Sequence, residues 1–234
     1  MRMHAEQRRN LILDILKNKK FISVNELSKA LNVSKTTIRS DLHFLESQKL
    51  IERYHGGAKI IQPHQDLPIE KSFLLRVREN SEKKREIAKK AISLINENDT
   101  IILDSSSTCF ELAKLLKESK KRLTVLTNGL KTADLLRENL NITVVIIGGI
   151  IKNNSNAIES LLGAEMLSKF NIDKYFVSAY GVSLENGFSD FNLYEIELKK
   201  LMLNISRKNI ALIDSTKFNR SSSLSFAKLT DVAA

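Results

Sequence analysis

Short apolar runs that alternate with helical patterns are the feature that most constrains how this 234-residue chain folds. Apolar runs of this length are typical of strands that are buried on both faces. Strands of that kind, joined by helices, form a largely parallel sheet, so we predict an α/β fold for residues 81–234. The runs lie at residues 100–103, 123–126, 142–147, 175–177 and 210–213, and helical patterns at residues 82–96, 110–117, 130–138 and 193–206.

The first sixty residues have the pattern of three short helices. Residues 6–18 carry apolar side chains at helical spacing. Ser23 and Glu26 have the spacing of a capping box, which predicts that a second helix begins there. Ser34 is placed to cap a third helix that runs to about Gln48.

A hairpin and a linker follow these helices. Residues 50–54 and 58–61 alternate around His55-Gly56-Gly57, which predicts a two-stranded wing. The small winged helix-turn-helix domain therefore spans residues 1–58. Both prolines of the chain come next, and because proline opposes helix we predict a linker over residues 59–80.

The positive charge of the chain is concentrated in this first domain. The chain carries a formal net charge of +10, and residues 1–60 hold 12 Lys and Arg against 6 Asp and Glu. A basic balance favours polyanionic partners, and its concentration in one domain is expected if that domain contacts a phosphate backbone.

The third helix has the residues that reading the major groove requires. Such a helix presents polar and basic side chains outward, while apolar residues such as Ile38 and Leu42 anchor it. The helix start also favours phosphate. We predict that double-stranded DNA is bound by Ser34, Lys35, Thr36, Thr37, Arg39 and Ser40 of this helix and by Arg53, Tyr54 and His55 of the wing.

Polar residues follow the predicted strands of the second domain at the points where the strands end. Ligands of open α/β sheets bind beyond the carboxyl ends of the strands. Hydroxyl groups at a helix start suit a phosphate, glycine permits close approach, and lysine neutralises an anion. We predict a ligand site formed by Asp104, Ser105, Ser106, Ser107, Thr108, Thr127, Asn128, Gly148, Gly149 and Lys217.

The segment from Val24 to Leu42, followed by Leu45-Glu46 and by His55-Gly56-Gly57-Ala58, resembles the head of the DeoR family of bacterial regulators. The family motif reads VS..TIRRDL..LE and then R.HGGA. This chain has Ser40 where the family usually has a second arginine, which removes one potential contact to phosphate or base. We therefore expect its operator preference or affinity to differ.

The second domain resembles the effector domain of the same family, which is similar in fold to ribose-5-phosphate isomerase and CoA transferases. The resemblance implies a repressor of a sugar or related carbon metabolism operon, controlled by a phosphorylated sugar or related metabolite. We expect no cofactor. Matching pieces lie at residues 84–91, 104–108, 127–128, 148–149, 163, 181, 187, 195–202 and 214–218.

The second domain departs from the family at three places. Ser106 stands where the family loop Asp-x-Gly-Thr-Thr has glycine, and Tyr180 stands where many members have aspartate. The family also continues into a further strand and helix beyond the position of Ala234, so we expect a shortened C-terminus. A changed pocket, a different ligand and weakened sensing all stay open.

Two other classes of function compete with this interpretation. An isomerase or acyl-transfer enzyme on the same scaffold would use Asp104, Glu195 or Glu197 as base and Lys217 as electrostatic stabiliser. An attached DNA-reading head has no role in such an enzyme, so we predict no catalytic activity. An RNA-binding or architectural protein is disfavoured because 6% aromatic residues and no Trp give few stacking platforms.

The remaining features concern location and assembly. The longest apolar stretch, residues 142–151, is too short to cross a bilayer, and no signal pattern opens the chain, so we expect a cytoplasmic protein. Scattered histidines and the single Cys109 predict no metal site and no intramolecular disulfide. One recognition helix reads few base pairs, so we expect a homo-oligomer, either a dimer or a tetramer.

Overall fold

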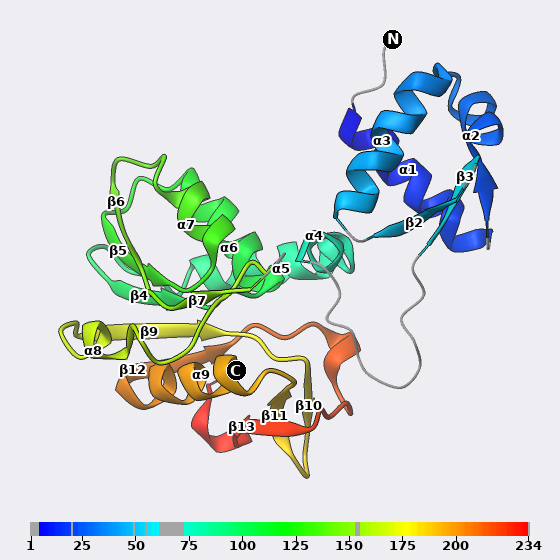
Figure 1. Cartoon of the computed structure of the whole chain (residues 1–234). Coiled ribbons are helices and arrows are strands. Elements are labelled where there is room, and N and C mark those ends of the chain that lie inside the picture. Colours follow the sequence, from blue (N-terminus) through cyan, green and yellow to red (C-terminus); the bar gives the residue numbers. More distant parts are fainter. Residues whose placement is uncertain are drawn as a thin grey trace. The chain divides into compact units, whose positions relative to one another are not determined.

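The computed structural model describes residues 5–19, 21–48, 50–54, 56–60, 73–152 and 155–233. These residues form two compact units, and the division falls between residues 72 and 73 (Figure 1). Residues 73–80, which were assigned to the linker, therefore belong to the second unit. Phe73 shows why: its ring is buried and packs edge-on against Phe110, with the ring centroids 5.4 Å apart.

The first unit has the predicted three helices and wing. Its core is made by apolar side chains that recur at helical spacing, and Leu27, Ile38 and Leu42 are fully buried. The sheet has the order β1-β3-β2, in which the short strand β1 was not predicted. The elements are α1 (Ala5–Asn18), β1 (Ile22–Ser23), α2 (Val24–Leu31), α3 (Lys35–Ser47), β2 (Ile51–Tyr54) and β3 (Gly57–Ile60).

Strand β1 depends on a glycine in the wing. A Cβ atom on Gly57 would lie 2.4 Å from the carbonyl oxygen of Ile22, which is closer than real Cβ atoms approach. The absence of a side chain at Gly57 therefore lets β1 pair with β3. The sequence alone gave no sign of this strand, because two residues are too few to show an alternating pattern.

A buried aspartate ties α3 to α1. Asp41 is 1% exposed and accepts hydrogen bonds from the guanidinium groups of Arg8 and Arg9, the latter at 2.9 Å. The Arg9 guanidinium also lies 3.8 Å from the ring centroid of Phe44. These contacts from two arginines to one carboxylate hold the orientation of α3 in the unit.

The second unit contains a five-stranded parallel sheet with the order β12-β9-β4-β5-β6. Helices α5, α6 and α7 cover one face, and α9 lies on the other (Figure 1). The principal elements are α4 (Phe73–Arg78), α5 (Ser81–Ile92), β4 (Thr100–Leu103), α6 (Ser107–Lys117), β5 (Leu123–Thr127), α7 (Leu130–Leu136), β6 (Ile142–Ile146), β9 (Ile172–Val177), α9 (Leu193–Ile205) and β12 (Ser206–Ala211).

An apolar core lies on each face of the sheet, and the central strand β4 sends alternate side chains into the two cores. Ile101 and Leu103 of β4 pack with α5 and α6, whereas Ile102 packs with α9 on the opposite face. The predicted α/β fold is thereby confirmed. The last predicted strand was placed wrongly, at residues 210–213. Strand β12 begins earlier, at Ser206, because it pairs only with β9 among the named strands and can expose polar residues there.

Several small elements of the second unit were not predicted. A hairpin of β7 (Ile150–Ile151) and β8 (Ile158–Glu159) lies between β6 and β9 in the chain, and α8 (Ala164–Leu167) comes after it. A separate antiparallel sheet has the order β10-β11-β13. Its strands are β10 (Gly181–Ser183), β11 (Gly187–Asp190) and β13 (Leu224–Ala227), and short 3-10 helices lie at Ser215–Lys217 and Leu229–Asp231.

Replacing Asp41 by alanine should loosen the first unit. The change removes the buried carboxylate that Arg8 and Arg9 share, and breaking a buried pair in this way costs about 3–5 kcal/mol. We expect the opening free energy of the α1 and α3 amides to fall by about 3 kcal/mol in hydrogen exchange of the full chain. Glu52→Ala, which removes an exposed partner of Lys59, should leave this exchange unchanged. Equal protection in both variants would contradict the role given to Asp41.

Candidate DNA-binding surface and ligand site

The start of α3 is held by its own side chains. The hydroxyl of Ser34 accepts a hydrogen bond from the backbone N–H of Thr37 at 3.2 Å and lies 2.9 Å from the Thr37 hydroxyl. Both predicted contact residues therefore also serve the helix cap. The other predicted residues of α3 are exposed: Lys35, Thr36, Arg39 and Ser40.

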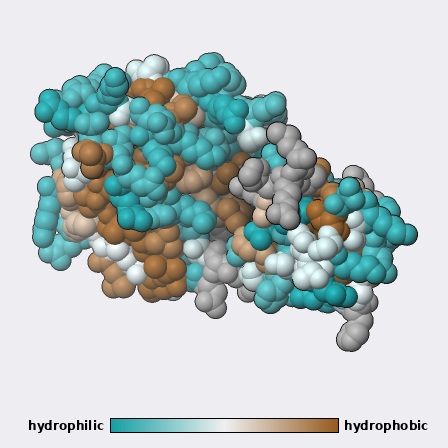
Figure 2. Space-filling view, turned by 90° about the horizontal axis from the view of Figure 1, so that it is seen from above, coloured by the Kyte–Doolittle hydropathy of each residue, from teal (hydrophilic) through white to brown (hydrophobic). Residues whose placement is uncertain are grey.

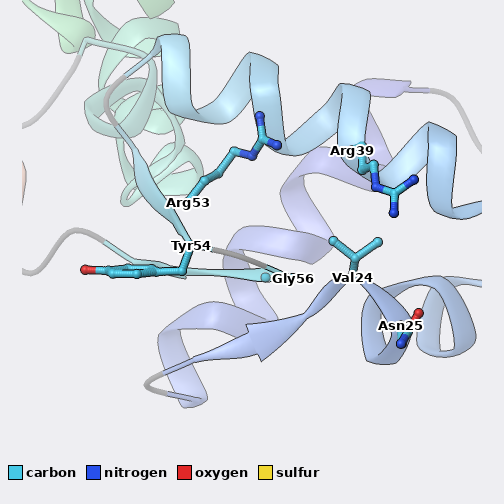
Figure 3. A pocket seen from close by; sticks show the side chains of 7 residues that line it. Val24, Asn25, Arg39, Arg53, Tyr54 and Gly56 are labelled. Atoms are coloured by element: carbon cyan, nitrogen blue, oxygen red, sulfur yellow. The ribbon is translucent and has the colours of Figure 1, made fainter.

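The wing and α3 enclose a hollow of about 180 Å³ (Figure 3). Arg39 of α3 and Arg53 of β2 both line it, and Tyr54 is exposed beside them. The third predicted wing residue, His55, lies outside the described residues. Asn25, in the first turn of α2, was missed by the sequence analysis because α2 was treated as a supporting helix. The lining residues are Val24, Asn25, Arg39, Arg53, Tyr54, Gly56 and Gly57.

In the second unit, Asp104 organises the loop that follows β4. One carboxylate oxygen accepts from the backbone N–H of Ser106 at 2.9 Å, and the other accepts from the N–H of Ser178 at 2.7 Å. The hydroxyl of Ser106 then caps α6 by accepting from the N–H of Cys109. Ser106 has φ of −71°, which any residue adopts, so a serine at the family's glycine position introduces no strain.

Three buried polar atoms around this loop have no hydrogen-bond partner. They are Oγ1 of Thr108, Oδ1 of Asn128 and Oγ1 of Thr132, in residues that are at most 3% exposed. A Cβ atom on Gly129 would lie 3.2 Å from Cα of Ser105 and 3.1 Å from the Thr132 hydroxyl, so α7 begins against the Asp104 loop. Buried polar groups are rarely left unpaired, so these atoms point to a missing polar partner.

The other predicted residues of the loops after β4 and β5 lie at the same edge of the sheet. Ser105 and Ser107 are buried at the start of α6. Thr127 is fully buried, and its hydroxyl accepts from the N–H of Gly129 at 3.0 Å. The loops after β4 and β5 therefore meet at one edge of the sheet, as expected of neighbouring parallel strands.

Two lysines reach the same edge of the sheet. Lys217 donates from Nζ to the Ser178 hydroxyl at 3.0 Å and to the carbonyl of Ala179. Burial lowers the pKa of Lys217 to about 8, against the opposing effect of Asp214. Lys199 of α9 was not predicted, because a lysine within a helical pattern usually faces solvent.

Lys199 is buried between two carboxylates. Its Nζ lies 2.7 Å from Asp190 and 3.9 Å from Asp104, and it donates to the carbonyl of Ser178 at 2.9 Å. Burial acts to lower the pKa of Lys199, but Asp190 and Asp104 outweigh it and raise that pKa above its ordinary value. Lys199 therefore holds the Asp104 loop to α9 as a permanent cation.

Gly148 and Gly149 have a packing role. A Cβ atom on Gly149 would lie 2.2 Å from the carbonyl oxygen of Glu159, and one on Gly163 would lie 2.5 Å from the carbonyl oxygen of Gly148. The two glycines are exposed and let the chain pass close to the segment from Glu159 to Gly163. Ligand contact by this pair stays a prediction.

Among the residues that the structure describes, no three His, Cys, Asp or Glu side chains form a group that could hold a metal ion. None of the helices described is both long enough and apolar enough to span a bilayer.

The stability of the second unit should depend on pH through Lys217. Its pKa is about 8 in the folded chain and near 10.5 when unfolded, so below pH 8 the fold buries a charge. As pH rises through 8, the folded chain loses this proton first and the penalty is relieved. Between pH 7 and pH 9, we expect the free energy of unfolding of wild type to rise by about 1 kcal/mol relative to that of Lys217→Met, measured by urea unfolding. A difference that stays constant with pH would contradict this assignment.

Comparison with known proteins matches both units to one family. Residues 8–64 match the DeoR-like helix-turn-helix domain, and residues 79–234 match the DeoR C-terminal sensor domain. Ribose 5 phosphate isomerase A from Neisseria gonorrhoeae has a TM-score of 0.45 and 21% identity, covering 61% of this chain and 55% of that one. That TM-score is too low to establish a shared fold, so the likeness to isomerases stays a prediction.

Relatives match over nearly the whole chain. The HTH-type transcriptional regulator GolR of Listeria innocua is 43% identical over 92% of this chain and 83% of its own length. The putative aga operon transcriptional repressor of Escherichia coli O157:H7 is 33% identical, covering 93% and 80%. The lactose phosphotransferase system repressor of Lactococcus lactis is 33% identical, covering 93% and 85%. The chain therefore belongs to the DeoR family of transcriptional regulators.

Proposed function

We propose that this protein is a cytoplasmic repressor that binds an operator through α3 and the wing and responds to a phosphorylated sugar or related metabolite. The relatives named as repressors of the aga operon and of the lactose phosphotransferase system support the sugar-operon role. The exposed face of α3 and its neighbouring arginines support contact with duplex DNA. The match to the DeoR sensor domain supports control by a small effector.

The observation that carries the effector proposal is the group of unpaired atoms on Thr108, Asn128 and Thr132. A bound metabolite would supply the missing hydrogen bonds, because its hydroxyl groups donate and accept and its phosphate oxygens accept. Lys217 lies at the same edge of the sheet and would neutralise part of the phosphate charge. This arrangement agrees with the rule that ligands bind beyond the carboxyl ends of parallel strands.

We propose further that the site does not catalyse a reaction. Both carboxylate oxygens of Asp104 accept backbone hydrogen bonds, so this group is occupied by its structural role. The Glu197 side chain is 44% exposed and pairs with Lys200 at 2.9 Å, so it is engaged in a surface ion pair. Glu195 also has an interaction partner. These carboxylates were the candidate bases of the rival enzyme interpretation, and turnover of pentose or hexose phosphates would favour that rival.

Self-association is expected through the second unit. Hydrophobic residues gather on part of its surface (Figure 2). Apolar patches of this kind mark interaction surfaces. Two DNA-binding units in one oligomer would give the operator specificity that a single recognition helix lacks. We therefore propose that the protein forms a dimer or a tetramer. Exposed apolar residues near β6 and the β7-β8 hairpin are Ile146, Ile150, Ile151, Leu161 and Leu162.

Replacing Thr108 by valine should separate effector binding from folding. Valine removes a hydroxyl that has no partner in the folded chain, so the melting temperature of the free protein should not fall. Wild type should be stabilised by at least one member of a panel of pentose and hexose phosphates, because a ligand that binds the native state raises its melting temperature. Thr108→Val should lose that stabilisation.

The matched control is Thr143→Val on the exposed part of β6, which should respond as wild type does. If Thr108→Val kept the full thermal shift, the buried hydroxyl would have no part in the site. If no phosphorylated sugar stabilised wild type, the effector class would be wrong.

A further inference from the structure

Arg39 lies on the side of α3 that faces the wing. Residues of an α-helix advance by roughly 100° each, and Ile38 is fully buried, so Thr36 and Ser40 point roughly opposite to the core. Arg39 is only about a quarter turn from Ile38. Its side chain therefore lines the hollow beside the wing, where Arg53 also lies (Figure 3).

The hollow is strongly cationic. In the part of the chain that the structure describes, the guanidinium of Arg39 makes no hydrogen bond or ion pair. Arg53 has a long contact of 3.4 Å to Glu46 and remains about one-third exposed. Asn25 adds an amide to the lining, whereas the Tyr54 ring points away from Arg39 (Figure 3), and no acidic residue is among the lining residues. A compact oxyanion with several acceptor oxygens matches this set of donors.

On the basis of the proposed DNA-binding function, we propose that this hollow binds one backbone phosphate of DNA, held jointly by Arg39 and Arg53. Guanidinium groups match phosphate geometry with paired hydrogen bonds. Phosphate contacts set the register of a protein on the duplex, whereas contacts to base edges carry sequence information. Arg39 is then a positioning residue, and base reading falls to the outward residues Thr36 and Ser40.

Glu46 is the residue that Arg53 contacts in the absence of DNA. It holds Arg53 while the hollow is empty, and the contact is long and half-exposed, so it is weak. A phosphate, with more acceptor oxygens than one distant carboxylate oxygen, would take over the Arg53 guanidinium. In this phosphate clamp, formed by Arg39 and Arg53, the Arg53 side chain would move from Glu46 to the phosphate.

The test uses the full chain and a duplex that wild type selects from a random-sequence library. Binding is measured by fluorescence anisotropy at several NaCl concentrations for wild type, Arg39→Gln, Arg53→Gln and the double variant. The control Lys90→Gln removes one exposed charge from α5 in the second unit. Neutralising one phosphate contributes about 0.9 to the slope of log K against log salt.

We expect each single variant to bind about ten- to a hundredfold more weakly, as loss of a charge-assisted hydrogen bond implies. The double variant should lose about 0.9 of the slope in total, because both arginines act on one phosphate. Selection repeated with Arg39→Gln should return the wild-type consensus. Lys90→Gln should match wild type in affinity and slope.

Other results would overturn the clamp while leaving DNA binding intact. A slope loss near twice that value in the double variant would mean two separate phosphates, and an unchanged slope would mean none. A changed consensus for Arg39→Gln would make Arg39 a base-reading residue. If wild type itself selected no duplex, the proposed function would fail and the clamp with it.

Discussion

The carboxylate of Asp104 is the interaction on which the second unit's site depends. It receives the backbone N–H of Ser106 from its own loop and that of Ser178 from the end of β9, and it lies 3.9 Å from the ammonium of Lys199. One side chain thus joins the ends of two neighbouring strands to α9. A buried carboxylate is stable only when such partners are present. The same partners place Thr108 and Lys217 at the edge where a ligand would bind.

In the first unit, the buried carboxylate of Asp41 likewise joins two elements, because it accepts hydrogen bonds from Arg8 and Arg9 of α1 and belongs to α3. The orientation of α3 matters because a recognition helix must present its outer face while its flank meets the phosphate backbone. Control of DNA by a metabolite also requires that the metabolite bind one arrangement of the heads more tightly than another.

The sequence pattern predicted what depends on periodicity and on short local signals. Helices with apolar spacing and strands such as β4 were found where predicted, and so were the caps at Ser23 and Ser34. The β7-β8 hairpin and the sheet of order β10-β11-β13 were not, because their short strands lack the continuous apolar run that marks β4. Strand β12 was misplaced because its polar half looks like a loop.

For the candidate site, the rule that ligands bind at strand ends grouped most residues that the structure brings together. Gly129, which follows Asn128, lies against the Asp104 loop, because a Cβ atom on it would be 3.2 Å from Cα of Ser105, whereas the Asn128 amide donates to the carbonyl of Ile158. Thr132 and Lys199 were missed because each lies inside a helix, where only tertiary packing turns it toward the sheet edge. Gly148 and Gly149 were assigned to ligand contact, yet their close approach is to the segment from Glu159 to Gly163.

The most direct test of this account is a titration of the protein–duplex complex with phosphorylated sugars. The full-length protein is bound to a duplex of its own selection, and duplex release or tightening is followed by anisotropy. The account predicts that at least one phosphorylated sugar changes duplex affinity by a measurable factor, while its unphosphorylated form does not. Tight, sequence-selective duplex binding that no such metabolite alters would contradict the central claim that the buried polar site governs the DNA-binding unit.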